Sequence, residues 1–215
     1  MSFYRHYIFP KFLDLAMSSP AFRKPRRRTL ARAHGRILEI GFGTGSNLEH
    51  YPPGVRRIEA IDPDPYLDRY SRPRIDASEV EVDFHRLDAE HLPFEGERFD
   101  TVVSTLTLCS IPDVMHALGE IRRVLKPGGQ FLFMEHGRDP RPASARWQDR
   151  LTPLWRPLAG GCCLNRPVLE LIESAGLVRD QVQSSYLRGV PTLLGYVTEG
   201  VARRPGTLQG TAAMP

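Results

Sequence analysis

A glycine-rich turn directly after a short apolar run is the feature of this sequence that most restricts its fold. The segment LEIGFGTG, residues 38–45, places glycines at positions 41, 43 and 45. Glycines at such a turn let the backbone bend tightly and approach a ligand closely. No Gly-Lys-Ser/Thr follows, so the segment is not a P-loop, and G-x-G-x-G is one residue shorter than a dinucleotide fingerprint. The turn therefore indicates a strand that leads either into a nucleoside site or into a plain strand-to-helix connection.

Apolar runs and helical patterns alternate along the chain from residue 36 onward. We expect helices near residues 44–51, 64–72, 113–129 and, in two pieces split by AGG, 146–177. We expect strands near residues 36–40, 56–62, 80–88, 99–111, 129–136, 178–187 and 192–202. Strands that alternate with helices favour an α/β fold, with a mainly parallel sheet covered on both faces.

The distribution of charge separates an N-terminal arm from the rest of the chain. Residues 1–30 carry seven basic side chains and one acid, a local charge of +6, whereas the whole chain has a net charge of +4. The remaining residues are therefore slightly acidic, and we predict no nucleic-acid partner. We expect a basic amphipathic arm at 1–30, a single domain at 31–202 and a disordered tail at 203–215.

The three cysteines are too few for a disulfide framework. Cys109, Cys162 and Cys163 also match no metal-ligand spacing, so we predict no metal and a reducing, cytoplasmic location. The chain has no apolar run of 18 residues, so we expect no membrane-spanning segment. The N-terminus lacks the pattern of a signal peptide.

Two acidic residues follow the second and third predicted strands. Asp62 in IDPDP lies about 20 residues after the glycine turn, where a carboxylate can accept hydrogens from both ribose hydroxyls. Asp88 in LDAEHLPF is placed to meet an adenine edge. Each acid alone is also typical of a helix cap or a turn. Their order after successive strands, together with the glycine turn, predicts a nucleoside site.

These motifs together resemble the class I S-adenosylmethionine-dependent methyltransferases of the methyltransferase domain 11 type. The segments YPPG, IDPDP, STLTLCSI, FMEH, GGCCLNR and LLGYV more narrowly resemble the methyltransferase-like seven family of alkyl thiol S-methyltransferases, over residues 30–200. The resemblance implies a Rossmann-like, doubly wound, mostly parallel seven-stranded sheet with an antiparallel final strand. Members of that family begin with a hydrophobic anchoring helix. This chain has only the shorter arm, so we do not expect membrane integration.

The resemblance also implies S-adenosylmethionine as cofactor and assigns residues to it. We expect Glu39 either to hold the ammonium of the amino-acid tail or to hydrogen-bond the loop backbone. Asp62 is assigned to the ribose, Asp88 and Ala89 to adenine, and Thr105 and Leu106 to the methionine portion. The complete predicted cofactor set is Glu39, Gly41, Gly43, Thr44, Gly45, Asn47, Asp62, Asp88, Ala89, Thr105 and Leu106.

The methyl acceptor is predicted to be a small hydrophobic molecule, an alkyl thiol in the first instance. His136 ends the fifth predicted strand and is the candidate general base, with a hydrogen-bonded rim histidine as the alternative. Cys109 is expected in the core. The candidate acceptor pocket consists of Trp147, Trp155, Cys162 and Cys163, although core packing explains the tryptophans equally well.

Two features leave alternatives open. The arm is either a lid over the cofactor or, through residues 1–28, a peripheral contact with an anionic inner membrane surface. The alternative activities are methylation of a phospholipid amine or a quinone precursor, and cofactor binding without catalysis. The oligomeric state is not predicted.

Overall fold

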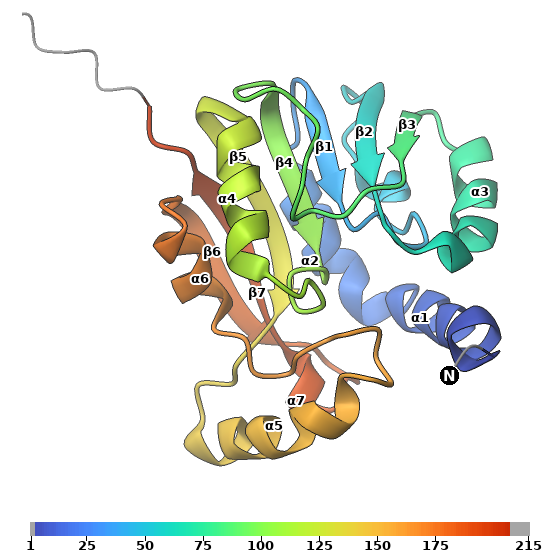
Figure 1. The fold of residues 1–215 in the computed structure, drawn as a ribbon, viewed down its shortest axis with the longest axis vertical. Coiled ribbons are helices and arrows are strands. Elements are labelled where there is room, and N and C mark those ends of the chain that lie inside the picture. The colour runs from blue at the N-terminus through green and yellow to red at the C-terminus, as the bar shows by residue number, and fades with distance from the viewer. Residues whose placement is uncertain (1–2, 207–215) are drawn as a thin grey trace, which may run out of the picture.

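Seven strands form one sheet in the computed structural model, which describes residues 3–206 (Figure 1). Their order is β3-β2-β1-β4-β5-β7-β6. Strands β1 to β5 pair in parallel, and β7 is antiparallel to both β5 and β6. The predicted doubly wound, mostly parallel sheet with an antiparallel final strand is confirmed. The strands span Ile37–Ile40 (β1), Arg57–Ile61 (β2), Glu81–His85 (β3), Phe99–Thr105 (β4), Leu125–His136 (β5), Val178–Tyr186 (β6) and Tyr196–Arg203 (β7).

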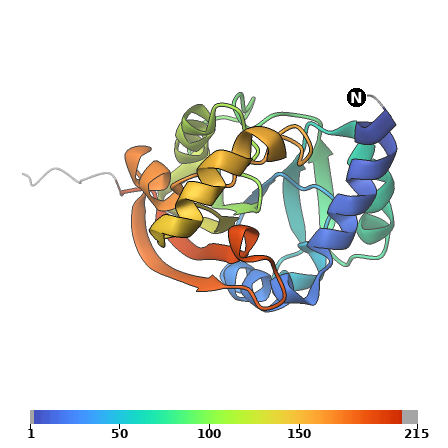
Figure 2. The same cartoon turned by 90° about the horizontal axis from the view of Figure 1, so that it is seen from below.

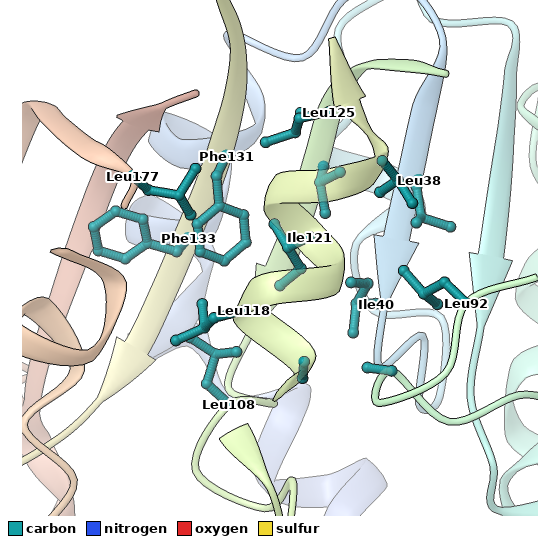
Figure 3. Close-up of a cluster of buried hydrophobic side chains, with 14 of the residues drawn as sticks. Leu38, Ile40, Leu92, Leu108, Leu118, Ile121, Leu125, Phe131, Phe133 and Leu177 are labelled. Carbon is teal, nitrogen blue, oxygen red and sulfur yellow. The ribbon is translucent and has the colours of Figure 1, made fainter. Parts of the chain in front are cut away.

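The central strands are buried on both faces, which explains their continuous apolar sequences. Figure 3 shows the core on one face, where Ile121 of α4 (Val114–Val124) lies between Phe133 of β5 and Ile40 of β1. The strand residues next to those of the first core point to the opposite face, because successive side chains of a strand alternate between the two faces of the sheet. They form a second core with Leu30, and its strand members are Ile37, Ile58, Ala60, Val103, Leu132 and Val201.

Helical segments cover both faces and one end of the sheet (Figures 1 and 2). In Figure 1, α1, α5 and α7 lie at the end toward which the parallel strands point. Besides α4, the helices are α1 (Phe9–Met17), α2 (Pro20–Leu30), α3 (Asp68–Asp76), α5 (Pro142–Trp155), α6 (Val168–Ser174) and α7 (Thr192–Gly195). Short non-α helical turns are η1 (Tyr4–Ile8), η2 (Leu48–His50) and η3 (Pro65–Leu67).

Three predicted elements differ from the structure at the functional edge of the sheet. The strand expected at 192–202 begins only at Tyr196, because Thr192–Gly195 form the helix α7. The helix expected at 44–51 is only a series of turns that ends in η2, because Gly45 takes a φ of +77° and the neighbouring residues favour turns over helix. The strand expected at 99–111 ends at Thr105, because Leu106 adopts a left-handed φ of +56°. The residues after Leu106 therefore form a loop at the strand end.

The C-terminal boundary also differs from the prediction. Strand β7 continues to Arg203, and the Arg204 amide donates a hydrogen bond to the carbonyl of Gly129 at 3.0 Å. The predicted disordered tail therefore does not begin at residue 203, and its part at 207–215 lies outside the described residues. Within residues 3–206, no helix is both long enough and apolar enough to cross a membrane.

Candidate active site

A cavity of about 710 Å³ lies at the carboxyl ends of β1, β2, β4 and β5. Open α/β sheets bind their ligands at this edge. The N-terminal arm forms part of the wall through Phe9, Phe12 and Phe22. Trp155 and Cys162 close the wall from the segment after β5. The site is therefore built from parts of the chain that are far apart in sequence.

The glycine turn needs glycine at position 41 for steric reasons. Gly41 has a φ of +72°, and a Cβ there would lie 2.2 Å from the Thr107 side chain. The amides of Gly41 and Phe42 both donate to the carbonyl of Ile61, which fixes the turn against the end of β2. Gly43 lines the cavity, and the nearest atom to a Cβ built there is 3.8 Å away. The turn thus leaves free space beside its backbone for a ligand.

Glu39 lies inside the protein rather than on the cavity wall. Its carboxylate accepts hydrogen bonds from Asn47 Nδ2 at 2.9 Å and from the Tyr51 hydroxyl at 2.7 Å. Burial raises the pKa of Glu39 to about 7, and these two hydrogen bonds oppose that increase. Asn47 also donates to Thr105 Oγ1 at 3.0 Å. Glu39 therefore holds in place Asn47, which lines the cavity, through side-chain hydrogen bonds rather than through the loop backbone, and it does not itself line the cavity where it would contact the cofactor ammonium.

Asp62 has the properties of a ligand-binding carboxylate. It is 7% exposed, and its two oxygens accept the amides of Gly43 and Asp64, each at 2.8 Å. Burial raises its pKa to about 6, although both backbone hydrogen bonds stabilise the charged form. Each oxygen keeps further acceptor capacity toward the cavity that it lines. A ligand with two adjacent hydroxyls fits this group.

The cavity wall includes most of the predicted cofactor residues. Asp88 Oδ1 accepts the amides of Glu90 and His91 at 3.0 Å, so this side chain shapes the turn that presents Ala89. Of the predicted set, the residues that line the cavity are Gly41, Gly43, Thr44, Asn47, Asp62, Asp88, Ala89, Thr105 and Leu106. This arrangement fits a nucleoside that carries an extension toward β4.

Two thiols and an imidazole meet at the other side of the cavity. Cys109, expected in the core, lies on the loop after β4 and lines the cavity with His136 and Cys162. His136 Nε2 is 2.9 Å from Cys162 Sγ. The Cys162 thiol, by donating to Cys109, lowers the pKa of Cys109 well below its usual value. Burial is the largest single influence on His136 and opposes its charged form, but the charge of Cys109, a hydrogen bond with Cys109 and the charge of Glu135 together outweigh it and raise the pKa of His136.

Two side chains, Glu135 and Arg166, hold the loop that carries Cys109. Glu135 accepts the Ser104 hydroxyl at 2.7 Å and the Thr107 amide at 3.1 Å. Arg166 donates to the carbonyls of Leu108 and Ile111. Glu135 therefore acts as a structural residue. The contact between Arg166 and this loop could not be predicted from the sequence, because the two are far apart along the chain.

Besides Glu39, three predicted site residues lie away from the cavity as the described residues define it. Gly45 faces Phe42, whose ring carbon would be 3.3 Å from a Cβ at that position. Trp147 is 54% exposed on α5, so only Trp155 of the predicted pair reaches the wall. Cys163 is half-buried and its amide donates to the carbonyl of Cys109. The predicted pocket therefore reduces to one tryptophan and one cysteine, with Cys109 added.

Sequence comparison relates the chain to methyltransferases. Residues 38–133 match the family profile described as methyltransferase domain. Human thiol S-methyltransferase TMT1B is 35% identical over 163 residues, which cover 72% of this chain and 65% of the relative. Human TMT1A is 37% identical over 153 residues, with coverages of 68% and 62%. Phosphatidylethanolamine N-methyltransferase of Cereibacter sphaeroides is 33% identical over 127 residues, with coverages of 56% and 62%. The chain spans 62–65% of the length of these relatives.

Solved structures with the same fold are distant in sequence. N-methyltransferase NodS from Bradyrhizobium japonicum has a TM-score of 0.64 at 17% identity and covers 87% of this chain and 98% of its own. The [4+2]-cyclase SpnF has a TM-score of 0.68 at 19% identity, with coverages of 86% and 81%. The fold alone therefore does not establish methyl transfer. Fold, site and family profile together support a class I S-adenosylmethionine-dependent methyltransferase. Within that class, its sequence is similar to the thiol S-methyltransferases TMT1B and TMT1A.

Proposed function

We propose that this protein transfers the methyl group of S-adenosylmethionine to the sulfur of a small apolar thiol. The observation that carries the proposal is one cavity that joins Asp62 to the side chains of Cys109, His136 and Cys162. Asp62 follows β2 and His136 ends β5, three strand positions away, which corresponds to a lateral separation of about 14 Å. This span suits a cofactor bound at one side and an acceptor at the other.

The cofactor side is assigned from its hydrogen-bonding capacity. Asp62 accepts the ribose hydroxyls, Asp88 and Ala89 border adenine, and Thr105 and Leu106 border the methionine portion. When bound, S-adenosylmethionine supplies a methyl carbon that its sulfonium activates for in-line displacement. The remaining task of the protein is to align the acceptor and to exclude water from it. The apolar side chains of the arm suit that second task.

The acceptor side contains one group that can take the proton of a thiol. A thiol reacts as thiolate, and its ordinary pKa is about 8.5. The imidazole of His136 lies at the cavity wall and is buried, so we propose it as the general base. Because its pKa is raised, the neutral form that accepts a proton increases only above the usual histidine range. The rate of thiol methylation is therefore expected to rise with pH through neutrality.

A labelled-methyl assay with a panel of acceptors tests the proposal. The panel holds alkyl thiols of increasing chain length, a phosphatidylethanolamine dispersion and a phenolic quinone precursor. We expect label in the alkyl thiols, and we expect Asp62→Ala to weaken cofactor affinity by about 10- to 100-fold, the loss of one to two hydrogen bonds to a charged group. Asp83→Ala removes an exposed carboxylate of β3 outside the cavity wall and is the matched control.

Each of the other outcomes identifies a different function. Label in the phospholipid amine or the quinone precursor, with inert thiols, would contradict the thiol proposal and support the alternative activity. Cofactor affinity without labelling of any acceptor would support a binding module. An Asp62→Ala variant with unchanged cofactor affinity would contradict the ribose assignment.

We propose that the arm is primarily a lid over this site. The Tyr4 hydroxyl donates to the carbonyl of Leu158 at 2.6 Å, and Asp14 pairs with Arg74 at 2.6 Å, so the arm is attached on both sides of the cavity. The arm also carries exposed apolar side chains, namely Phe3, Tyr7, Ile8, Phe12 and Leu15. Apolar side chains beside basic ones also suit contact with an anionic membrane. Salt-sensitive pelleting with phosphatidylserine vesicles, lost on deletion of residues 1–28, would support that second role, and no pelleting would exclude it.

A further inference from the structure

Two sulfur atoms and an imidazole nitrogen come together at the cavity wall from three separate segments. Cys109 lies on the loop after β4, His136 is the last residue of β5, and Cys162 lies on the loop after α5. One ligand atom from each side chain lies within 4.8 Å of those of the other two, and His136 Nε2 is 2.9 Å from Cys162 Sγ. Their side chains are 2%, 6% and 9% exposed, and all three line the cavity. This is a compact donor set with one open side.

The three ligand atoms are near enough to share one tetrahedral zinc ion after a small adjustment. With Zn–S of about 2.3 Å and Zn–N of about 2.0–2.1 Å, tetrahedral ligands lie about 3.8 Å apart for two sulfurs and about 3.6 Å for sulfur and nitrogen. The Cys162–His136 pair must then open by about 0.7 Å to admit the ion. Gly160 and Gly161 precede Cys162 with φ values of +60° and +94°, so the loop bends at residues with high conformational freedom.

The surroundings of the three side chains suit metal-bound thiolates. The Ser110 hydroxyl lies 3.5 Å from Cys109 Sγ and can donate to it. Trp155 Nε1 is buried, lines the same cavity and has no hydrogen-bond partner within residues 3–206, so it is a donor available to sulfur. His136 Nδ1 is likewise without a partner among these residues. No donor therefore forces Nδ1 to accept a hydrogen bond. The hydrogen of the neutral imidazole can lie on Nδ1, which leaves the lone pair of Nε2 free to bind a metal.

We propose that Cys109, His136 and Cys162 bind one zinc ion whose fourth position faces the cavity and takes the sulfur of the methyl acceptor. Two thiolates, one neutral imidazole and an open position form the donor set of a catalytic rather than a closed structural zinc site. This inference rests on the proposed thiol acceptor and names the means of its activation. With zinc bound, His136 is a metal ligand and the thiol proton passes to water; the general-base role proposed above applies to the metal-free protein.

The step balances without any further reactant. The acceptor thiol binds the ion as thiolate and releases its proton to water. The thiolate sulfur supplies the electron pair for the new bond to the methyl carbon, while the pair of the breaking carbon–sulfonium bond stays with the cofactor sulfur. The products are a neutral thioether and S-adenosylhomocysteine. A thioether is a weaker zinc ligand than a thiolate, which favours release of the methylated product.

Zinc stoichiometry in the full chain tests the site without reference to activity. The reduced protein is equilibrated with Zn²⁺, freed of excess ion and analysed by elemental mass spectrometry. We expect about one zinc per chain in the wild type, and a reduction of about tenfold or more in Cys109→Ser, Cys162→Ser and His136→Ala. Cys163→Ser is the matched control, because Cys163 is adjacent to Cys162 but lies off the cavity wall, and it should retain zinc.

A second measurement keeps the test valid if a variant folds poorly. Co²⁺ in the wild-type site should give an intense thiolate-to-metal absorption band that changes when an alkyl thiol is added. Unchanged circular dichroism and S-adenosylhomocysteine affinity identify the variants that fold correctly. Absence of stoichiometric zinc from the wild type, an equal loss in Cys163→Ser, or a Cys109–Cys162 disulfide under reducing conditions would overturn the site.

The failures of the two proposals can be distinguished. If the zinc-depleted protein methylates thiols at the full rate, the activating role of the metal is overturned while the proposed function stands. If zinc binds stoichiometrically but no thiol is methylated, the site stands and the proposed function fails.

Discussion

The pH dependence of cofactor binding follows directly from the burial of Asp62. Its pKa is about 6 in the ligand-free protein, and only the charged form can accept hydrogens from both ribose hydroxyls with both oxygens. If the cofactor binds only when Asp62 is charged, the apparent cofactor affinity equals the intrinsic affinity multiplied by the ionised fraction of Asp62. That fraction is close to one at pH 8 and about one in eleven at pH 5, so affinity should fall about tenfold over this interval. The midpoint of the decrease should lie near pH 6.

Isothermal titration with S-adenosylhomocysteine measures this effect without turnover and without the sulfonium charge. Titrations in two buffers with different ionisation enthalpies also report proton release on binding, which should be about half a proton near pH 6. Glu39 has a pKa of about 7 and also titrates in this range. The Asp62→Asn variant retains the contribution of Glu39, so the difference between the two profiles isolates Asp62. Parallel profiles for wild type and variant would refute the reasoning.

Asp62 changes the pH dependence of the free energy of unfolding in the direction opposite to that of a surface carboxylate paired with a cation. The folded-state pKa of Asp62 is raised above its ordinary value of 3.8, so the folded protein binds the proton more tightly than the unfolded chain. In the absence of ligand, this group therefore favours folding more as the pH falls through about 6. A shift of about two pKa units corresponds to roughly 3 kcal/mol of unfavourable charge burial at neutral pH. Hydrogen bonds from the ribose hydroxyls of a bound cofactor would offset part of the free energy that burial of the Asp62 charge costs.

Three further predictions concern single side chains. Gly41→Ala should lower the free energy of unfolding by about 2–4 kcal/mol in urea titrations, because its Cβ would clash with a neighbouring side chain, whereas Gly43→Ala should cost only about 1 kcal/mol but weaken cofactor binding. Equal losses of stability in the two variants would contradict the reasoning. Tyr51→Phe should destabilise the protein by about 1–3 kcal/mol, since it removes a hydrogen bond to a buried carboxylate, and a neutral result in the same titration would exclude that role. Trp155→Ala should raise the KM for the acceptor more than the KM for the cofactor, and the exposed Trp147→Ala should change neither.

The cofactor side of the site follows from sequence because its signals are local. The glycine turn begins where β1 ends, and Asp62 directly follows β2, so their meeting requires only that parallel strands end at one edge of the sheet. Even there, local pattern does not determine the direction of every side chain. Glu39 lies on the strand that precedes the turn, yet its side chain points into the second core and accepts a hydrogen bond from the Tyr51 hydroxyl. The expected helix after the turn is absent because turn-forming residues outweigh a weak helical pattern.

What the sequence by itself determined is the succession of the seven strands, the ligand edge of the sheet and the nucleoside type of its binding loop. What only the tertiary structure decided is the acceptor side. Cys109, His136 and Cys162 are separated by more than twenty residues each, and no spacing rule predicts their contact. They meet because β4 and β5 are neighbours in the sheet and because the glycine-containing loop after α5 folds back over the strand ends. Such contacts depend on how distant segments pack together, and local sequence patterns do not predict this packing.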